Sequence, residues 1–273
     1  MQHILDLIAS GQHREAVAAI RQRLDAKHSF EGNGWLCGHL LALDGDWDAV
    51  TRLLPKQTNV LDTSGWLLSV RMGRPVDRDG KPIPWMTYAA IDFLGTKLQP
   101  AMRVFEWGAG FSTIWLASRV QEIVSIEESN AWYEELRPQL PANVSLLCRP
   151  DRDAYVDAIR ETTGEFDLIV IDGVHRNECA SACLSRLSPN GMVVFDNSDG
   201  AEYDPGMTMF NDAGFLRIDF WGLIPSYLYK NCTSILFRNP DLLRGSELPS
   251  RQDLSTGISC MQAIDRAMRP QPR

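Results

Sequence analysis

Residues 104–113, Val-Phe-Glu-Trp-Gly-Ala-Gly-Phe-Ser-Thr, decide the fold of this chain. They predict a short apolar strand ending in Glu106, followed by a glycine turn that opens a helix. A second apolar stretch ends in another acid, Glu127, nineteen residues after Gly108. A glycine turn paired with such a downstream acid predicts an adenosine-containing cofactor at the carboxyl end of a parallel sheet.

Each residue of this pattern has an expected role toward the cofactor. Gly108 and Gly110 are expected to let the backbone approach the ligand, because glycine carries no side chain. The amide groups that open the next helix attract an anion, and Ser112 in its first turn is a predicted cofactor contact. Glu127 is expected to accept hydrogen bonds from both ribose hydroxyls.

The identity of the cofactor depends on Thr113 and Glu106. A dinucleotide fingerprint requires a third glycine where Thr113 stands. The Glu106 carboxylate would repel a pyrophosphate but would attract the ammonium group of a methionine moiety. The pattern E-x-G-x-G followed by an acid-terminated strand resembles the class I S-adenosylmethionine-dependent methyltransferases, over roughly residues 82–238. A glycine turn in another doubly wound protein is the alternative.

The alternation of strand and helix predicts an α/β fold. We expect a Rossmann-like, seven-stranded, mostly parallel sheet with helices on both faces, plus a small N-terminal α-helical extension. The resemblance implies that the last two strands pair antiparallel. The expected strands lie near residues 102–106, 122–127, 143–148, 166–172, 191–196, 215–220 and 233–238. Thr87 is expected to cap a helix that runs to about Lys97.

The expected domains are a helical extension (1–60), a linker (61–86), a methyltransferase domain (87–240) and a tail (241–273) with a short helix near 256–268. The extension contains two similar segments that begin at Gly11 and Gly45, 34 residues apart. This period resembles that of tetratricopeptide helix pairs. The pairs are interpreted as a cap or a dimer surface, or as a groove that presents a peptide.

Oxygen donors follow two of the expected strands. Asp172 ends one strand, and Asp196 with Asn197 ends the next, so the three are expected to converge beside the cofactor. Such ligands suit Mg²⁺. The arrangement is similar to that of the metal-dependent catechol and caffeoyl-coenzyme-A O-methyltransferases. Those relatives have a lysine where this chain has His175, which is a candidate base. The alternative is a metal-free site in which Asp172 contacts cofactor or acceptor directly.

Further contacts are expected from residues around this edge. Trp85 and Tyr88 lie just upstream of the first strand, where they can cover the methionine end of the cofactor. Asp153 is the predicted adenine contact, although Asp151 is equally well placed and one of the two can cap the next helix. The aromatic residues considered for a pocket that attracts a sulfonium are Trp85, Tyr88, Trp107, Trp221, Tyr227 and Tyr229.

Composition limits the partners. The net charge is −8 and the sequence has no basic run, which disfavours nucleic acid. No signal peptide and no apolar run long enough for a membrane span are visible, so a cytoplasmic protein without a membrane partner is expected. Six cysteines without a C-x-x-C pair are interpreted as reduced core residues.

These observations predict a methyltransferase that uses S-adenosylmethionine, acting on an oxygen or nitrogen of a small metabolite. The chain is expected to work alone or as a homodimer. Methylation of a peptide held by the N-terminal helices is a variant. A nicotinamide-dependent oxidoreductase is disfavoured by Thr113 and Glu106, and a non-enzymatic helical adaptor is disfavoured by the complete set of motif residues.

Overall fold

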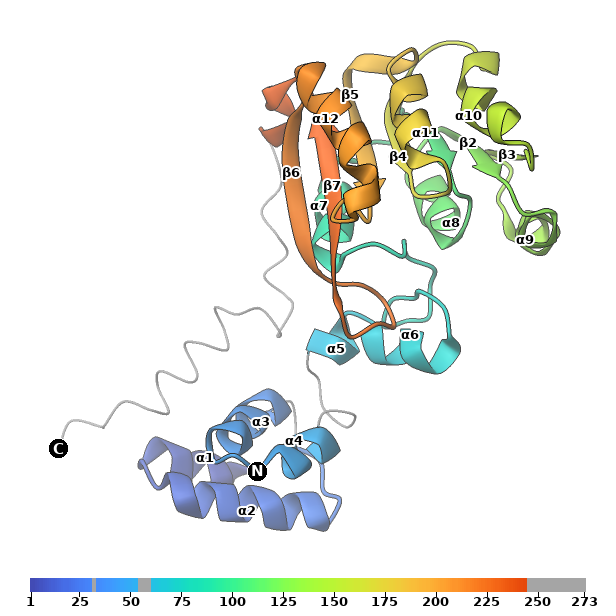
Figure 1. The fold of residues 1–273 in the computed structure, drawn as a ribbon. Helices are drawn as coiled ribbons and strands as arrows, with labels where there is room; N and C mark the ends of the chain where they lie inside the picture. The colour runs from blue at the N-terminus through green and yellow to red at the C-terminus, as the bar shows by residue number, and fades with distance from the viewer. Residues whose placement is uncertain (31–32, 54–59, 245–273) are drawn as a thin grey trace. The chain divides into compact units, whose positions relative to one another are not determined.

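A computed structural model describes residues 1–30, 33–53 and 60–244. These residues divide into two compact units, with the boundary in the chain between Leu68 and Ser69. The first unit contains helices, and the second contains the sheet and its covering helices (Figure 1). The predicted tail helix near 256–268 lies outside the described residues.

The N-terminal unit is built from consecutive helix pairs. Its helices are α1 (Gln2–Ala9), α2 (His13–Asp25), α3 (Gly34–Leu43), α4 (Trp47–Leu53) and α5 (Val60–Thr63). Gly11 turns the chain between α1 and α2 with φ +77°, and Gly45 does the same between α3 and α4 with φ +76°. The two segments therefore share one turn geometry, as the sequence repeat predicts. Their tetratricopeptide character stays a prediction.

The expected linker, 61–86, contains helical structure that the sequence pattern did not predict. Most of α5 and all of α6 (Trp66–Met72) lie within it. The turn-forming residues concentrate after Gly73, so the earlier part of the segment is free to be helical. Gly65, at φ +83°, separates the two helices.

The second unit contains the predicted sheet of seven strands. They are β1 (Arg103–Trp107), β2 (Glu122–Glu127), β3 (Val144–Cys148), β4 (Phe166–Ile171), β5 (Leu187–Asp196), β6 (Leu216–Leu223) and β7 (Lys230–Phe237). Their order across the sheet is β3-β2-β1-β4-β5-β7-β6. The first five strands pair in parallel, while β7 is antiparallel to both β5 and β6. The predicted fold class and the antiparallel end are confirmed.

Helices cover both faces of this sheet. They are α7 (Tyr88–Lys97), α8 (Phe111–Ala117), α9 (Asn130–Leu136), α10 (Arg152–Glu161), α11 (Arg176–Cys183) and α12 (Asp204–Asp212). Short 3₁₀ turns span Arg137–Gln139, Ala201–Tyr203 and Pro240–Leu243. Within the described residues, no helix is long and apolar enough to cross a membrane.

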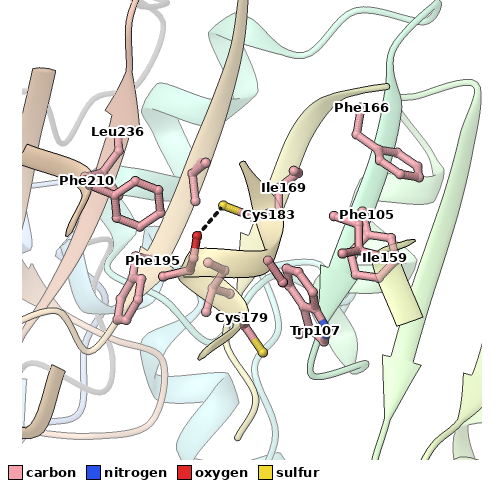
Figure 2. Packing of buried hydrophobic residues seen from close by; sticks show 14 of the residues in the cluster. Phe105, Trp107, Ile159, Phe166, Ile169, Cys179, Cys183, Phe195, Phe210 and Leu236 are labelled. Carbon is pink, nitrogen blue, oxygen red and sulfur yellow. Dashed lines mark hydrogen bonds between the residues drawn. The ribbon is translucent and has the colours of Figure 1, made fainter. Parts of the chain in front are cut away.

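Side chains that alternate along the strands build one core on each face. Phe105 and Trp107 of β1 join the cluster under α10, α11 and α12, which Figure 2 shows. Val104 joins the cluster under α7 and α8. Burial on both faces explains the continuous apolar runs of the parallel strands.

Strand β5 begins four residues earlier than expected. Leu187 pairs with Phe166 of β4, and pairing resumes only at Met192 with Leu168. The residues between them include Pro189, which has no amide hydrogen to donate to a neighbouring strand. The register shift therefore lies at the amino end of the sheet, away from the carboxyl edge.

Candidate functional site

The glycine turn after β1 packs tightly against the turn after β4. Gly108 has φ +94°, and a Cβ added to it would lie 2.6 Å from the Gly173 amide nitrogen and 2.8 Å from the Asp172 carbonyl carbon. A Cβ on Gly173 would lie 2.0 Å from the Tyr155 hydroxyl oxygen. Gly108 thus lets two turns approach each other, which is a packing requirement beyond the expected approach to a ligand.

Gly110 has the opposite surroundings. Its φ is −174°, an extended conformation open to any residue, and an added Cβ would meet no atom within 4 Å. Gly110 also lines the cavity at this edge of the sheet. Both glycines line the cavity, and Gly110 is the one with open space around it.

The Glu106 carboxylate is buried and accepts three hydroxyl hydrogen bonds. Ser112 donates to one oxygen, and Thr113 and Ser125 donate to the other, each at 2.5 Å. Burial raises the pKa of Glu106, and the three hydroxyl groups oppose this shift. The side chain is fully buried, so its expected contact with a methionine ammonium is not formed by this geometry. Glu106 instead ties β1 to β2 and to the start of α8.

A cavity of about 410 Å³ opens at the carboxyl ends of β1, β2 and β4. Carboxylates enter it from the two strands that flank β1: Glu127 ends β2, and Asp172 follows β4. The cavity is lined by Pro75, Trp85, Gly108, Ala109, Gly110, Phe111, Ser112, Glu127, Glu128, Trp132, Tyr155, Asp172, Gly173 and Val174. Its volume is in the range of small-molecule and cofactor sites.

Glu127 is held in place by the backbone that follows it. Its Oε1 accepts a hydrogen bond from the Ser129 amide at 2.8 Å, and the residue is 7% exposed. Burial raises the pKa of Glu127. A carboxylate fixed in this way, with its second oxygen not used by that bond, can accept hydrogen bonds from a polar ligand in the cavity.

Three aromatic residues of the cavity, Phe111, Trp132 and Tyr155, were not identified from the sequence. Trp132 donates from Nε1 to the Ala109 carbonyl at 2.8 Å, and its ring lies 6.4 Å from that of Phe111. Trp132 and Phe111 line the cavity together with Glu127. The available signal was position: Trp132 follows the acid-terminated β2 by five residues and so returns to the same edge of the sheet.

Arg176 places a positive charge at the carboxyl edge of the sheet, and it was not identified from the sequence. Its guanidinium donates to the carbonyl groups of Gly173 at 2.7 Å, Asp172 at 3.0 Å and Asp196. One nitrogen lies 3.3 Å from the Asp172 carboxylate, and the side chain is buried. Arg176 therefore joins the carboxyl ends of β4 and β5. Its signal in the sequence is its place directly after the β4 turn.

The predicted Mg²⁺ ligands do not fit a metal ion. Asp172 is paired with Arg176, whose fixed positive charge lies between the two strand ends. Asp196 is 2% exposed and accepts from the Thr233 hydroxyl, while Asn197 donates to the Asn231 side chain at 3.1 Å. Among the described residues, no group of three His, Cys, Asp or Glu side chains is arranged to hold a metal ion.

Burial is the largest cause of the pKa shifts of Asp172 and Asp196. It raises the pKa of Asp172, while the Arg176 charge opposes the shift. It also raises the pKa of Asp196, and the nearby Asp172 charge adds to that shift. Both carboxyl groups thus hold protons more tightly than ordinary aspartates.

Several predicted residues are not brought to the cavity. His175 starts α11 with φ +53°, and its ring meets that of Tyr155 edge-on at 6.2 Å, but it is absent from the cavity lining. Tyr88 packs against the cluster under α7 and α8. Trp107 is fully buried and donates to the Tyr155 carbonyl.

The choice between Asp151 and Asp153 is narrowed by the structure. Asp151 caps α10, accepting from the amides of Asp153 and Ala154. This leaves Asp153 as the remaining candidate for an adenine contact, although it does not line the cavity. Thr87 occupies the N-cap position of α7, but its side chain does not form the expected cap bond. Its amide donates to the Thr233 hydroxyl.

Residues 105–198, which run from within β1 to just past the end of β5, match a family model described as a methyltransferase domain. This match assigns a methyltransferase domain to these residues. The matched segment contains the ends of β1, β2 and β4, where the cavity opens. No protein of curated function matches the chain.

The chain is also similar in fold to several solved structures. A putative O-methyltransferase from Klebsiella pneumoniae is 16% identical, with a TM-score of 0.47, covering 66% of this chain and 90% of that one. An O-methyltransferase from Streptomyces achromogenes involved in tomaymycin synthesis, solved with S-adenosylmethionine, is 18% identical, with a TM-score of 0.45 and coverage of 66% and 90%.

Proposed function

We propose that this methyltransferase transfers a methyl group from S-adenosylmethionine to an oxygen or nitrogen of a small-molecule metabolite. The observation that carries the proposal is the cavity, in which Glu127 and Asp172 face one space from opposite sides of the β1 turn. A carboxylate on each side provides one group to hold the donor and another to act at the acceptor.

The proposed cofactor contacts follow the cavity lining. Glu127 accepts from the ribose hydroxyls, and Trp132 and Phe111 cover the adenosine from the same side. Gly110 and Ser112 open α8, so the backbone amides there attract the methionine carboxylate. Asp153 remains the proposed adenine contact beyond the cavity rim.

When bound, S-adenosylmethionine supplies an electrophilic methyl group for in-line displacement. The chain has to hold the acceptor in line, exclude water and accept a proton if the nucleophile carries one. Asp172 is the proposed base because it lines the cavity and its raised pKa brings it nearer to neutrality. Arg176 orients this carboxylate through its ion pair. His175 would assist only if it reached the cavity.

Two other functions remain as alternatives. A peptide or protein acceptor would be held by the N-terminal helix pairs, which is favoured only by their tetratricopeptide-like repeat. A non-enzymatic helical adaptor would keep the fold and lose turnover. No nucleic-acid partner is proposed, because the net charge is −8.

The test combines binding and turnover. Calorimetry should show binding of S-adenosylmethionine and S-adenosylhomocysteine, and none of NAD. Transfer of a labelled methyl group should then be measured against hydroxylated and amino-bearing metabolites and against peptides. Cofactor binding without turnover on any of these acceptors would favour the adaptor, and turnover on peptides alone would favour the variant.

A further inference from the structure

Three aromatic rings form a continuous strip beside the cavity. Trp85 lines the cavity and stacks on Tyr227, with ring centroids 5.7 Å apart and an interplanar angle of 21°. Tyr227 in turn contacts Tyr229, with centroids 5.1 Å apart and an angle of 34°. We call Trp85, Tyr227 and Tyr229 the aromatic strip.

The aromatic strip is open to solvent. Trp85 is 37% exposed, Tyr227 43% and Tyr229 54%. Leu228, between the two tyrosines, is 77% exposed. A contiguous exposed apolar patch that adjoins a cavity is a feature of binding sites, because water covers such a surface poorly.

The strip is also held in a fixed position. Trp85 donates from Nε1 to the Pro225 carbonyl at 2.8 Å, and two residues later the Thr87 amide donates to the Thr233 hydroxyl at 3.1 Å. These bonds join the segment before α7 to the turn and strand around β7. Rings fixed before binding lose little freedom when a ligand arrives.

We propose that the aromatic strip is the platform for the methyl acceptor, and that the acceptor carries a flat aromatic ring. The inference rests on the proposed function, since it names the substrate class of the same site. Trp85 belongs to both the strip and the cavity, so a ring stacked on the strip presents its substituents to the place where the methyl group is transferred. Aromatic stacking contributes about 0.5–1.5 kcal/mol beyond the area buried.

A second copy of the chain is a poorer occupant. Aromatic side chains bury about 150–250 Å² each, so three half-exposed rings offer roughly 300 Å², whereas stable interfaces bury about 800 Å² per partner. A small flat molecule matches the exposed area of the strip, because a single ligand ring covers one or two of its side chains.

The test uses phenol and cyclohexanol, which have the same size and hydroxyl group but differ in the ring. Saturation transfer from the full-length protein to each probe is measured by NMR in the presence of S-adenosylhomocysteine. Phenol should receive at least threefold more saturation than cyclohexanol. Tyr227→Ala should lower the phenol signal at least threefold, Tyr227→Phe should retain it, and Trp47→Ala, which removes an exposed ring from the other unit, should not change it.

Equal signals from the two probes, or a phenol signal that survives Tyr227→Ala, would overturn the platform. A wild-type dimer that Tyr227→Ala converts to a monomer would overturn it in favour of an interface between copies. Affinity for S-adenosylhomocysteine, measured by calorimetry, should be the same in all variants. Failure of the wild-type protein to bind it would overturn the proposed function, and with it the acceptor role of the strip, irrespective of the phenol signals.

Discussion

Gly108 and Gly173 pack backbone against backbone, so closely that a single methyl group on Gly108 would come within 2.6 Å of the Gly173 nitrogen. Gly110, two residues along, has open space around it. The two glycines of one motif therefore serve different purposes, and matched substitutions separate them.

Gly108→Ala should lower the free energy of unfolding by roughly 2–4 kcal/mol, through left-handed strain and a backbone clash. Gly110→Ala should change it by less than about 1 kcal/mol, because an extended backbone accepts alanine, yet it should weaken S-adenosylhomocysteine binding by narrowing the cavity. Chemical denaturation and calorimetry measure the two effects. Equal destabilisation by both variants would contradict the assignment.

Glu127→Gln should weaken S-adenosylmethionine binding about tenfold, or roughly 1–2 kcal/mol, because charge-assisted hydrogen bonds to the ribose are lost. Glu135→Gln is the matched control, since Glu135 lies exposed on the following helix α9. Calorimetry at fixed pH gives both affinities. An unchanged affinity of the Glu127 variant would refute the ribose contact.

Asp196 should make the protein less stable as the pH rises. Burial raises the pKa of Asp196 in the folded state, so between the ordinary carboxyl value, about 4, and the raised value the unfolded chain binds fewer protons than the folded one. Unfolding is thus increasingly favoured through that window. Asp196→Asn keeps an acceptor for the Thr233 hydroxyl and removes this titration.

Denaturation midpoints measured from about pH 5 to pH 7.5 should show the wild-type protein losing roughly 1–3 kcal/mol relative to Asp196→Asn. Parallel curves for the two proteins would show that Asp196 titrates normally.

Chelation should leave the site unaffected. Because Arg176 supplies the positive charge between the ends of β4 and β5, excess EDTA should change neither the affinity for S-adenosylhomocysteine nor the melting temperature. Adding Mg²⁺ should have no effect either. Arg176→Met should lower the melting temperature, because three carbonyl groups lose their donor. Activity lost in EDTA and restored by Mg²⁺ would reinstate the metal site.

The N-terminal helices should be dispensable for cofactor binding. A chain that starts at Ser64 keeps α6 whole, and both clusters of the sheet unit begin no earlier than Ile83. Its affinity for S-adenosylhomocysteine should stay within about twofold, whereas stability, oligomeric state or acceptor turnover should fall. A truncated chain that equals the full-length protein in all of these would show the helices to be an unrelated appendage.

The fold was predictable because its signals are local. The apolar runs, the glycine turn and the acid-terminated β2 each lie within a few residues, and their alternation specifies a parallel sheet. The start of β5 was harder to predict from the sequence, because the register shift around Pro189 depends on how β4 pairs with β5.

The site was predictable only in part. Residue type and strand position sufficed to bring Glu127, Gly110 and Asp172 to the cavity. The hydroxyl partners of Glu106 were not foreseen, because Ser125 reaches it from the neighbouring strand β2. The role of Arg176 likewise depends on carbonyl groups from two strands, which no spacing along the chain reveals.

The hydrogen bond from Trp85 to Pro225 joins residues 140 positions apart and so has a consequence for the order of assembly. During synthesis, the strands that carry the glycine turn and the two acids are complete long before residue 225 leaves the ribosome. The part of the cavity at the ends of β1, β2 and β4 can therefore form early. The aromatic strip forms only after β6 and β7 have been synthesised, because contacts between residues far apart in the sequence form late. A nascent chain could therefore bind the proposed cofactor before it could bind a methyl acceptor.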